Sequence, residues 1–370
     1  MRSSDVGVID FPTLGDLLDA WYEQHCFVPG GVLRGAPFKQ YDWQFWCSSN
    51  FYRVREDIDE WDGVPILNQA FVYRRAQVVA PQKTGKGPWD ACLLAGEAVG
   101  PSQYAGWAED GDVYRCSENG CPCGWEYPYL EGEPKGMRHP SPLLQILATS
   151  EDQAEMNVYG PLKAMVRLGP LKNLLLVREG FMRIVGQNAD DPDLDRIDVV
   201  SASATSRIGN PISFAVQDET GLYTKSNKLM KVSDAQRRGA AGMGGRTIET
   251  TNAWDPAEDS VAQRTYEAQA DDIFRFFRDP DREPALRGAD GKPLSYASKA
   301  NRRKIHAYVY KGSDHVNLDS IEAEAAEIAE KDPAQAERFF GNRVVAGGGA
   351  WMPRGMWEAR RADVVASESS

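Results

Sequence analysis

A Gly-Lys pair between an apolar stretch and a helical pattern is the first feature of the chain that could perform chemistry. Residues 78–101 read VVAPQKTGKGPWDACLLAGEAVGP. Their spacing approaches the phosphate-binding loop G-x-x-x-x-G-K-[ST], whose backbone N–H groups surround phosphates while the lysine reaches the outer phosphates and the hydroxyl touches Mg²⁺. Ala80 stands in place of the first glycine, and Gly87 in place of the hydroxyl residue. Because Gly-Lys pairs are also common in solvated turns, this stretch alone indicates nucleotide binding only weakly.

Two adjacent acids, Asp218 and Glu219, follow the apolar stretch ISFAVQ at 212–217. In α/β sheets, ligands bind at the carboxyl ends of the strands. One acid at such an edge can hold Mg²⁺, and a second can orient or deprotonate the attacking water. Adjacent acids at a strand end also occur in solvated turns. Together with the Gly-Lys loop, however, they predict hydrolysis of a nucleotide, with Lys86 and Asp218 holding the phosphates and Mg²⁺ and Glu219 activating water.

A cysteine-rich stretch offers a second set of reactive side chains. Three thiols and an imidazole lie close together in the sequence, at Cys116, Cys121, Cys123 and His139. Four such ligands could hold tetrahedral zinc, although Cys-x-Cys is tighter than the usual spacing. Buried or free thiols in a stiff loop are the alternative. The remaining histidines have no such neighbours in the sequence and are expected to be structural or solvated: His25, His306 and His315.

Basic residues gather between 225 and 246, where the only acid is Asp234. They are Lys225, Lys228, Lys231, Arg237, Arg238 and Arg246. Binding to a DNA backbone requires concentrated cations of this kind. A solvated helix face is the alternative explanation.

Strand-like and helix-like stretches alternate along the chain and must position these residues. Strands are expected within 71–80, 143–150, 173–180, 181–187, 197–203, 210–221 and 245–256. Helices are expected from about Pro88 and over 151–166, 225–238 and 257–279. This alternation predicts an α/β fold with a mostly parallel central sheet flanked by helices. An aromatic-rich helical lead-in precedes it, and 103–141 is expected to be an insertion or a long irregular loop.

The whole chain sets further limits on function. Its 370 residues carry 42 basic and 54 acidic side chains, a formal charge of −12, so contact with nucleic acid requires a local basic patch. No apolar run approaches the roughly 20 residues of a membrane-spanning helix, and the N-terminus lacks a signal-peptide pattern. We therefore expect a cytoplasmic protein that is neither secreted nor membrane-bound. Six cysteines in a chain of this length do not indicate a disulfide scaffold.

Several segments, in order, resemble the large terminase subunit of tailed bacteriophages, and most of all its actinobacterial-phage type. This family is the ATP-driven motor that packages DNA into a preformed head. The family often replaces the first glycine of the loop and carries an extra basic residue before Gly-Lys, as Lys83 does in APQKTGKGP. YDWQ at 41–44 is similar to its adenine-recognition segment, ATSEDQA at 148–154 to a helicase-like segment, and ETTNAWDP at 249–256 to its coupling segment. The resemblance covers roughly residues 38–357.

The resemblance implies a RecA-like P-loop ATPase of the additional-strand class that uses ATP and Mg²⁺, with Walker A-like and Walker B-like segments. Glu219, Lys86 and Arg207 would be catalytic, with Arg207 reaching the nucleotide of a neighbouring subunit; the alternative is an ion pair of Arg207 with Asp195 or Asp198. The nucleotide and metal would contact Gln44, Gln82, Lys83, Thr84, Gly85, Lys86, Gly87 and Asp218, with Gln44 reading the base. The coupling residues would be Thr250, Thr251 and Asn252.

The resemblance also implies partners and a division of the chain. Double-stranded DNA, the portal protein, the small terminase subunit and further copies in a homo-oligomeric ring are the expected partners, in the host cytoplasm during virion assembly. Residues 1–60 would form the lead-in with the adenine segment, 61–345 the ATPase domain, and 346–370 a linker or tail. Because family members continue into a nuclease domain that this chain does not contain in complete form, DNA cleavage by this chain alone is not expected.

Gly87 departs from the family pattern. Without its hydroxyl, Mg²⁺ is expected to depend on Asp218, phosphate oxygens and water, helped by Thr84, and a serine at 87 is expected to lower the Mg²⁺ requirement. Two alternatives to a packaging motor stay open. One is another nucleic-acid-dependent ATPase such as a helicase, and the other is a degenerate, non-hydrolysing docking subunit.

Overall fold

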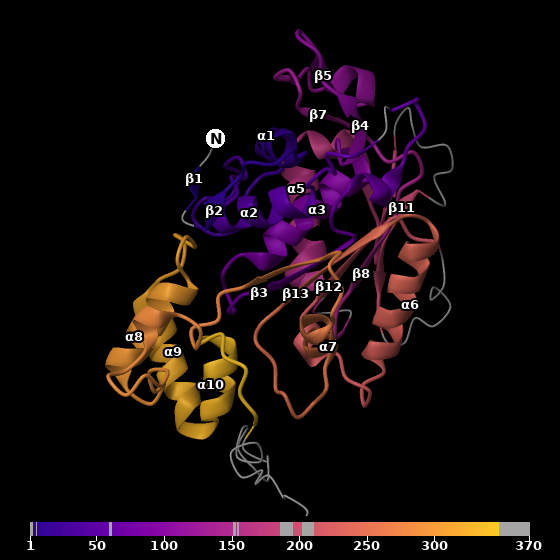
Figure 1. The fold of residues 1–370 in the computed structure, drawn as a ribbon. Helices are drawn as coiled ribbons and strands as arrows, with labels where there is room; N and C mark the ends of the chain where they lie inside the picture. The colour runs from indigo at the N-terminus through magenta and orange to yellow at the C-terminus, as the bar shows by residue number, and fades with distance from the viewer. Residues whose placement is uncertain are drawn as a thin grey trace, which may run out of the picture.

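An eight-stranded sheet forms the centre of the molecule in the computed structural model (Figure 1). The structure describes residues 3–4, 6–58, 61–150, 153, 155–185, 195–201 and 211–347. Across the sheet the strands are β14 (Ile273–Phe277), β3 (Arg75–Val79), β13 (Arg246–Thr251), β12 (Phe214–Asp218), β8 (Leu143–Leu147), β11 (Arg196–Val200), β10 (Phe181–Ile184) and β9 (Leu175–Val177). Neighbours from β14 to β11 are parallel, whereas β10 and β9 pair antiparallel at one edge. The predicted mostly parallel sheet is confirmed.

The position of β13 identifies the type of sheet. β13 lies between β3, which leads into the Gly-Lys loop, and β12, which ends at the two acids. The additional-strand class expected from the resemblance requires a strand between these two, and β13 occupies that position. β12 is buried at every position, as expected for a central strand covered on both faces.

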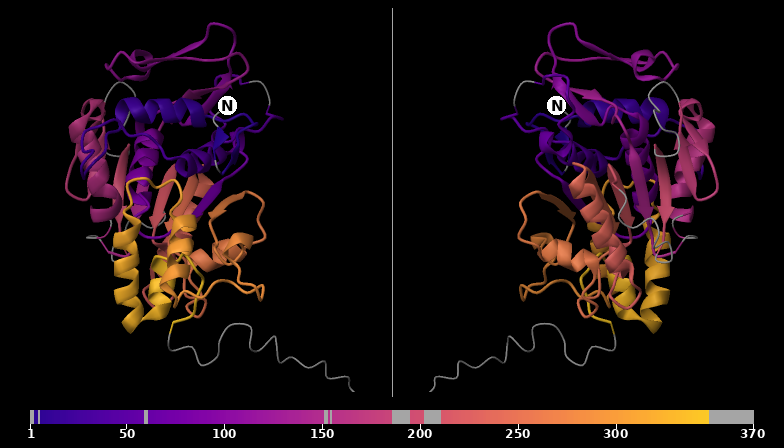
Figure 2. Two further views of the ribbon diagram at one scale, coloured as in Figure 1. Left: turned by 90° about the vertical axis from the view of Figure 1, so that its left-hand side faces the viewer. Right: turned by 90° about the vertical axis from the view of Figure 1, so that its right-hand side faces the viewer.

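Helices cover both faces of the sheet (Figures 1 and 2). α3 (Lys86–Val99) contacts β8, β11 and β12, and α5 (Gly160–Leu168) packs beside α3. α6 (Leu229–Gly242) contacts β12 and β13 on the other face, and α7 (Val261–Glu267) contacts β3. After its first turn α3 is buried on all sides, and its side chains there are mostly small or apolar, such as Ala91, Leu93 and Leu94. This is typical of a helix enclosed between a sheet and other helices.

The N-terminal residues belong to the same hydrophobic core as the sheet. α1 (Gly15–His25) and α2 (Asp42–Phe51) contribute buried Trp21, Tyr22 and Phe51 to a cluster that also contains residues of β3, β8 and β12. The predicted lead-in is therefore packed against the sheet, with α1 lying on α3. A short pair, β1 (Ser3–Ser4) and β2 (Gly7–Val8), precedes it.

The segment 103–141 is more regular than the irregular loop that the sequence suggested. β4 (Gln103–Trp107) pairs antiparallel with β7 (Pro134–Met137), and between them β5 (Val113–Arg115) pairs with β6 (Glu126–Pro128). These nested pairs project beyond the end of the sheet, at the top of Figure 1. Strands of only three to five residues between glycines and prolines give little periodicity in the sequence.

The helix expected over 257–279 is present only at Val261–Glu267, and the rest of the prediction is wrong. α7 ends at Glu267, and the chain then extends into β14, which pairs parallel with β3. Phe274 and Phe276 of β14 are buried while Arg275 and Phe277 are half-buried, which fits the two-residue period of a strand. Aromatic and β-branched side chains favour this strand, although their spacing also fits a helical face.

The C-terminal helices form a second core inside the region predicted as one ATPase domain. α8 (Lys299–Val309), α9 (Leu318–Lys331) and α10 (Pro333–Phe339) enclose Ile305, Tyr310 and Ile321, among others. Figure 2 shows these helices, in orange and yellow, beside one end of the sheet. Among the helices that the structure describes, none is long and apolar enough to cross a membrane.

Arg246 at the start of β13 is an internal residue and not a DNA contact. Its guanidinium forms a 2.8 Å ion pair with Glu97 of α3, and both side chains are at most 3% exposed. It also donates to the Phe51 carbonyl oxygen at 2.8 Å and lies 3.8 Å from the centre of the Phe71 ring. Burial raises the pKa of Glu97, and Arg246 counteracts this. The pair therefore ties the helix after the Gly-Lys loop to the sheet.

Arg246→Ala should lower the free energy of unfolding by about 3–5 kcal/mol, because it leaves the buried Glu97 carboxylate without its cation, with only the neutral donors Tyr52 and Gln103 beside it. The double variant Arg246→Met with Glu97→Met should lose less than the sum of the two single changes, since it removes both charges. Chemical denaturation followed by circular dichroism measures both values. Arg303→Ala, which breaks an exposed ion pair with Asp319, is the control and should cost under about 1 kcal/mol. Equal losses for Arg246→Ala and Arg303→Ala would contradict the assignment.

Candidate active site

The Gly-Lys loop turns between the end of β3 and the first residue of α3. β3 ends at Val79 and α3 begins at Lys86, two residues before the predicted start at Pro88. Gly85 has φ +94°, a left-handed conformation that favours glycine, and Lys83 also has a positive φ of 67°. The strand, tight loop and helix predicted from the sequence are therefore present.

The side chain of Lys86 folds back into the loop. Its Nζ donates to the carbonyl oxygens of Ala80 at 2.7 Å and Pro81 at 2.8 Å, and to Oδ1 of Asn252 at 3.1 Å. Burial lowers the pKa of Lys86 to about 8, while the nearby acids Asp218, Glu219 and Asp90 counteract this. The ammonium group is thus held by neutral acceptors next to a group of carboxylates.

Asp218 and Glu219 lie at the end of β12, as predicted. Asp218 is 4% exposed, and its Oδ2 accepts a hydrogen bond from Asn157 Nδ2 at 3.1 Å. Burial raises the pKa of Asp218, and Lys86 partly offsets this. Glu219 turns the chain out of the strand with φ +61°, and its backbone N–H donates to the Thr250 carbonyl oxygen. Burial, and then the charge of Asp218, raises the pKa of Glu219.

Asp90 is a third acid of the site that the sequence analysis missed. It is fully buried on α3, and Thr250 Oγ1 lies 2.9 Å from its Oδ2 and 3.1 Å from Asp218 Oδ1. Its Oδ1 has no hydrogen-bond partner among the described residues. Burial, and then Asp218, raises the pKa of Asp90 well above its usual range. The signal was available, because Asp90 follows Lys86 by four residues and so shares its helix face.

Gly87 is required by a close backbone approach. A Cβ atom built on Gly87 would lie 2.0 Å from the carbonyl oxygen of Asn157. Asn157 belongs to the π-helical turn Glu155–Tyr159, and its side chain bonds to Asp218. This close approach argues against the expectation that a serine at 87 improves the site, since a side chain there must displace Asn157.

The hydroxyl of Thr84 does not face the cavity, where it was expected to help bind the metal. Its hydroxyl donates to the Pro81 carbonyl oxygen at 3.0 Å and is buried within the loop. A cavity of about 350 Å³ lies over the loop instead, and its wall brings together the predicted residues Gln82, Lys83, Gly85, Lys86, Gly87, Asp218, Glu219 and Asn252. Thr84 is not among the residues that line it. The two lysines of this lining, Lys83 and Lys86, can attract phosphate, and its carboxylates, Asp218 and Glu219, are groups that can bind a metal ion.

Gln44 contacts the loop through its side-chain amide. Its Nε2 donates to the Gly85 carbonyl oxygen at 3.1 Å, while its Oε1 accepts from the Tyr41 backbone N–H at 3.0 Å. A largely apolar cavity of about 640 Å³ adjoins it, lined in part by Leu33, Phe38 and His315. Gln44 therefore lies between the loop and a second cavity, with its amide already bonded on both sides.

The predicted coupling residues join β13 to the loop and to the acids. Thr250 bridges Asp90 and Asp218, and Asn252 accepts from Lys86. Thr251 Oγ1 accepts from the Gly221 backbone N–H at 2.9 Å, just beyond the two acids. A change at Lys86 can therefore reach the end of β13 directly.

The helical region at the C-terminus also contacts the loop backbone. His315 lies 2.9 Å from the Lys83 carbonyl oxygen through Nε2 and 2.8 Å from the Tyr41 hydroxyl through Nδ1. The Gln82 backbone N–H donates to the Phe339 carbonyl oxygen at 2.9 Å. His315, expected to be structural or solvated, is thus a neighbour of the candidate site, whereas His306 bonds to Tyr296 inside the second core.

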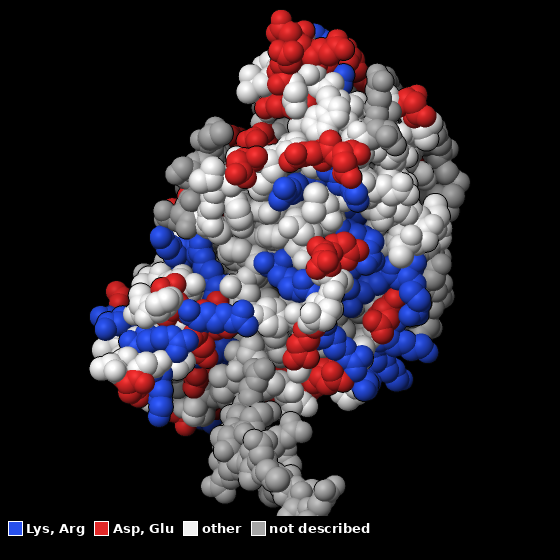
Figure 3. Space-filling view, in the orientation of Figure 1, with Lys and Arg blue, Asp and Glu red and all other residues white. Residues whose placement is uncertain are grey.

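The predicted DNA-binding residues separate into two groups. Lys228, Lys231 and Arg238 are exposed on and beside α6, where Figure 3 shows Lys and Arg gathered with carboxylates among them. Lys225 is exposed but pairs with Asp259 at 3.5 Å. Arg237 is largely buried and bonds to Glu249 at 2.9 Å, so it serves the internal packing of α6 on β13.

Arg207 lies outside the described residues, as do parts of the segments 148–154 and 346–370. Of the two acids considered as its alternative partners, Asp198 forms an ion pair with Arg196 at 3.0 Å, and Asp195 accepts from Ser141 Oγ at 3.0 Å.

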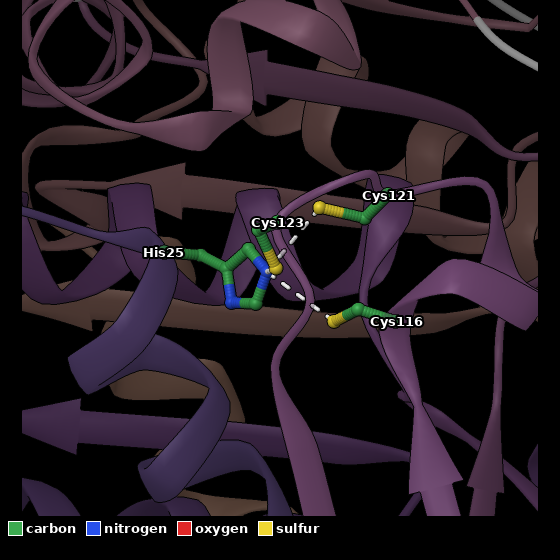
Figure 4. Close-up of side chains that lie close together, drawn as sticks. All are labelled: His25, Cys116, Cys121 and Cys123. Carbon is green, nitrogen blue, oxygen red and sulfur yellow. Dashed lines mark hydrogen bonds between the residues drawn. The ribbon is translucent and has the colours of Figure 1, made fainter.

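The cysteine cluster is completed by His25 and not by His139. Nε2 of His25 lies 3.4 Å from the sulfurs of Cys116 and Cys123 and 3.6 Å from that of Cys121 (Figure 4). His139 accepts instead from the Ser141 backbone N–H through Nδ1. Because α1 and the insertion meet only in the folded chain, His25 gave no signal in the sequence. The four side chains form a group that can hold a metal ion.

Comparison with known proteins gives a match in structure and not in sequence. No family model and no curated protein matches the chain. The large terminase of bacteriophage HK97 superposes with a TM-score of 0.58 at 17% identity, over 90% of this chain and 55% of that one. The ATPase domain of the Thermus phage P74-26 large terminase gives a TM-score of 0.39 at 12% identity, covering 74% of this chain and 89% of that one. The large terminase of a thermophilic bacteriophage, in complex with ATP-gamma-S, gives 0.32 at 10% identity, over 63% and 44%.

The chain thus spans about 55% of the length of the HK97 protein and follows its fold over most of its own residues. The fold predicted from the terminase resemblance is confirmed.

Proposed function

We propose that this chain binds ATP with Mg²⁺ and hydrolyses it as the motor subunit that drives double-stranded viral DNA into a phage prohead. The observation that carries the proposal is that Lys86, Asp218 and Glu219 line one cavity at the carboxyl edge of an additional-strand sheet. The likeness in fold to the HK97 large terminase supports the biological setting.

The residues around the cavity suit Mg²⁺·ATP. Backbone N–H groups of the loop and the Lys86 ammonium would bind the phosphates. Asp218 would hold Mg²⁺. Asp90 is linked to Asp218 by the Thr250 hydroxyl, which lies within hydrogen-bond distance of both carboxylates, and Oδ1 of Asp90 lacks a partner among the described residues. When bound, Mg²⁺ neutralises phosphate charge and polarises the phosphoryl oxygens. With two buried carboxylates already present, the site does not depend on a hydroxyl at position 87.

Glu219 is the proposed general base. It lines the cavity beside Asp218, and burial together with Asp218 raises its pKa, which improves a carboxylate as a proton acceptor near neutral pH. Gln44, at the edge of the apolar cavity, is the proposed base-recognition residue.

Asn252 is the proposed sensor of the nucleotide. It holds Lys86 in the present structure, so a phosphate that attracts the ammonium must compete with Asn252. Release of Asn252 would then affect Thr251 and the Gly221 turn that follows the acids.

The remaining parts of the proposal concern partners. We propose that copies of the chain form a ring on the portal protein, with a small terminase subunit, in the host cytoplasm during assembly. Arg207 would act on the neighbouring nucleotide, and the exposed Lys228, Lys231 and Arg238 would contact DNA. The division into 1–60, 61–345 and 346–370 is part of the same proposal, and no nuclease activity is proposed for this chain.

Glu219→Gln should reduce ATP turnover by about 10²–10⁴-fold and leave ATP binding nearly unchanged, because the amide cannot accept the proton of water but keeps the shape of the carboxyl group. Phosphate release and binding of a fluorescent ATP analogue are measured on the same protein, with and without duplex DNA. Glu324→Gln, an exposed acid on α9, is the matched control and should behave as wild type. Turnover of Glu219→Gln equal to that of the control would remove the catalytic role.

Affinity for ATP-gamma-S should fall as the pH rises from about 7 to about 9, because burial lowers the pKa of Lys86 to about 8 and the neutral amine attracts phosphate less. Lys86→Met should bind weakly at every pH in this range. Lys83→Met, which changes an exposed lysine of the same cavity, should weaken binding but keep the pH dependence. Titrations at constant ionic strength measure the effect. Identical slopes in wild type and Lys86→Met would mean that Lys86 does not touch the ligand.

Gly87→Ser and Gly87→Ala should both lower turnover and destabilise the protein by about 1–3 kcal/mol, because either side chain must push Asn157 away from the loop and from Asp218. Comparing the two variants separates the effect of the added Cβ atom, which both carry, from the effect of the hydroxyl, which only serine carries. Gly242→Ser, at a position with open space, is the control. Mg²⁺ titrations of ATPase activity and thermal denaturation are the measurements, and a stable Gly87→Ser with a lower Mg²⁺ requirement would contradict the close approach.

A further inference from the structure

We infer that His25, Cys116, Cys121 and Cys123 bind one zinc ion, which joins the N-terminal helix α1 to the insertion after α3. This site is separate from the proposed ATPase reaction and does not rest on it. His25 is the last residue of α1, and the three cysteines lie around β5 and the turn that follows it (Figure 4).

The distances are those of ligands around a common centre. With zinc bonds of about 2.0 Å to nitrogen and 2.3 Å to sulfur, a tetrahedral site separates nitrogen from sulfur by about 3.5 Å. The three observed separations are 3.4, 3.6 and 3.4 Å. All four ligand atoms lie within 4.8 Å of one another. These separations are compatible with four ligands around one zinc ion.

Hydrogen bonds accepted by a neutral imidazole do not account for all three sulfur contacts of His25. Nε2 of a neutral imidazole has one lone pair and can accept one good hydrogen bond, yet three sulfurs point at it. A cation between the four atoms gives each of them a partner. Zinc is the ion that this mixture of one imidazole and three thiolates favours.

The surroundings prepare His25 to act as a ligand. Its Nδ1 lies 2.8 Å from the Trp21 carbonyl oxygen, so the proton is placed on Nδ1 and the lone pair of Nε2 faces the sulfurs. Such a bond on the second ring nitrogen is the usual support of a metal-binding histidine. The ring also stacks on Trp21 with a centroid distance of 4.3 Å and meets the edge of Trp125. Its orientation is thus fixed from several sides.

The cysteine loop is equally constrained. The Cys116 backbone N–H donates to the Trp125 carbonyl oxygen, and the Cys121 backbone N–H donates to the Cys116 carbonyl oxygen. Gly120 allows this turn with φ +78°. Cys116 and Cys121 are buried and Cys123 is half-buried, and a zinc ion held by all four side chains would have no open position for a substrate. A closed site of this kind is structural, and not catalytic.

The site has a clear structural consequence. α1 packs on α3, where Tyr22 fills the space beside Gly96 and Trp21 the space beside Gly100. Zinc would therefore fix α1 and the insertion against the end of the helix whose first residue is Lys86. Loss of zinc should loosen this end of the molecule.

Metal analysis of the full chain, purified under reducing conditions and washed with a mild chelator, tests the inference. We expect one zinc ion per chain, and reconstitution with Co²⁺ should give the intense thiolate-to-cobalt and d–d absorption of a tetrahedral thiolate site. His25→Ala and Cys121→Ser should lose most of the metal. His139→Ala and Cys47→Ser, which change an imidazole and a buried thiol outside the cluster, should retain it.

Wild-type protein provides a measurement that does not depend on the folding of a variant. A mercurial thiol reagent should release one zinc ion for every three cluster thiols that it modifies. The released zinc is measured by the absorbance of a chelator that changes colour on binding it. Chelation should also lower the melting temperature, and added zinc should restore it. Zinc well below one per chain, equal zinc in His25→Ala and wild type, or a disulfide among the three cysteines would overturn the inference.

Discussion

The buried ammonium of Lys86 is the interaction on which the rest of the site depends. A charge removed from water is costly unless it is well solvated by the protein, and here two loop carbonyls and Asn252 supply that solvation. Asp90, Asp218 and Glu219 balance it at a greater distance. Because no carboxylate is hydrogen-bonded to Nζ in the described structure, the ammonium is held firmly but not neutralised, and it can still attract phosphate. The strand order matters for the same reason, since only an inserted β13 brings Asn252 to the loop and Thr250 to the acids.

The loop is also contacted by two regions that lie far from it in the sequence, one before the sheet and one after it. α2 reaches it through Gln44 and Gly85, and the C-terminal helical region through His315 and Lys83. Trp43 of α2 donates to Ser313 at 3.1 Å, so these two regions are joined to each other as well. A change in the loop would therefore be transmitted to the helices packed beside the sheet, which is what the proposed motor function requires.

Local signals in the sequence predicted much of this structure. The Gly-Lys loop, the acids after β12 and the alternation of strands and helices each depend on residues that are neighbours in the chain, and each was found. The errors involve contacts between distant residues. His25 meets the cysteines across more than ninety positions, and Gly87 is explained by a carbonyl oxygen seventy residues away. Arg246 looked like part of a basic patch because its partner, Glu97, lies on another element. At 257–279 the apolar spacing suited a helix, but pairing with β3 favoured a strand at 273–277.

We expect the ammonium of Lys86 to exchange its hydrogen bond with Asn252 for one with a phosphate oxygen when a nucleotide binds. A structure of the full chain with Mg²⁺ and a non-hydrolysable ATP analogue tests this most directly. It should show the phosphates in the cavity over the loop and Lys86 Nζ bonded to a phosphate oxygen, with its contact to Asn252 Oδ1 broken. A nucleotide bound elsewhere, or a bound nucleotide with Lys86 still on Asn252, would contradict the account.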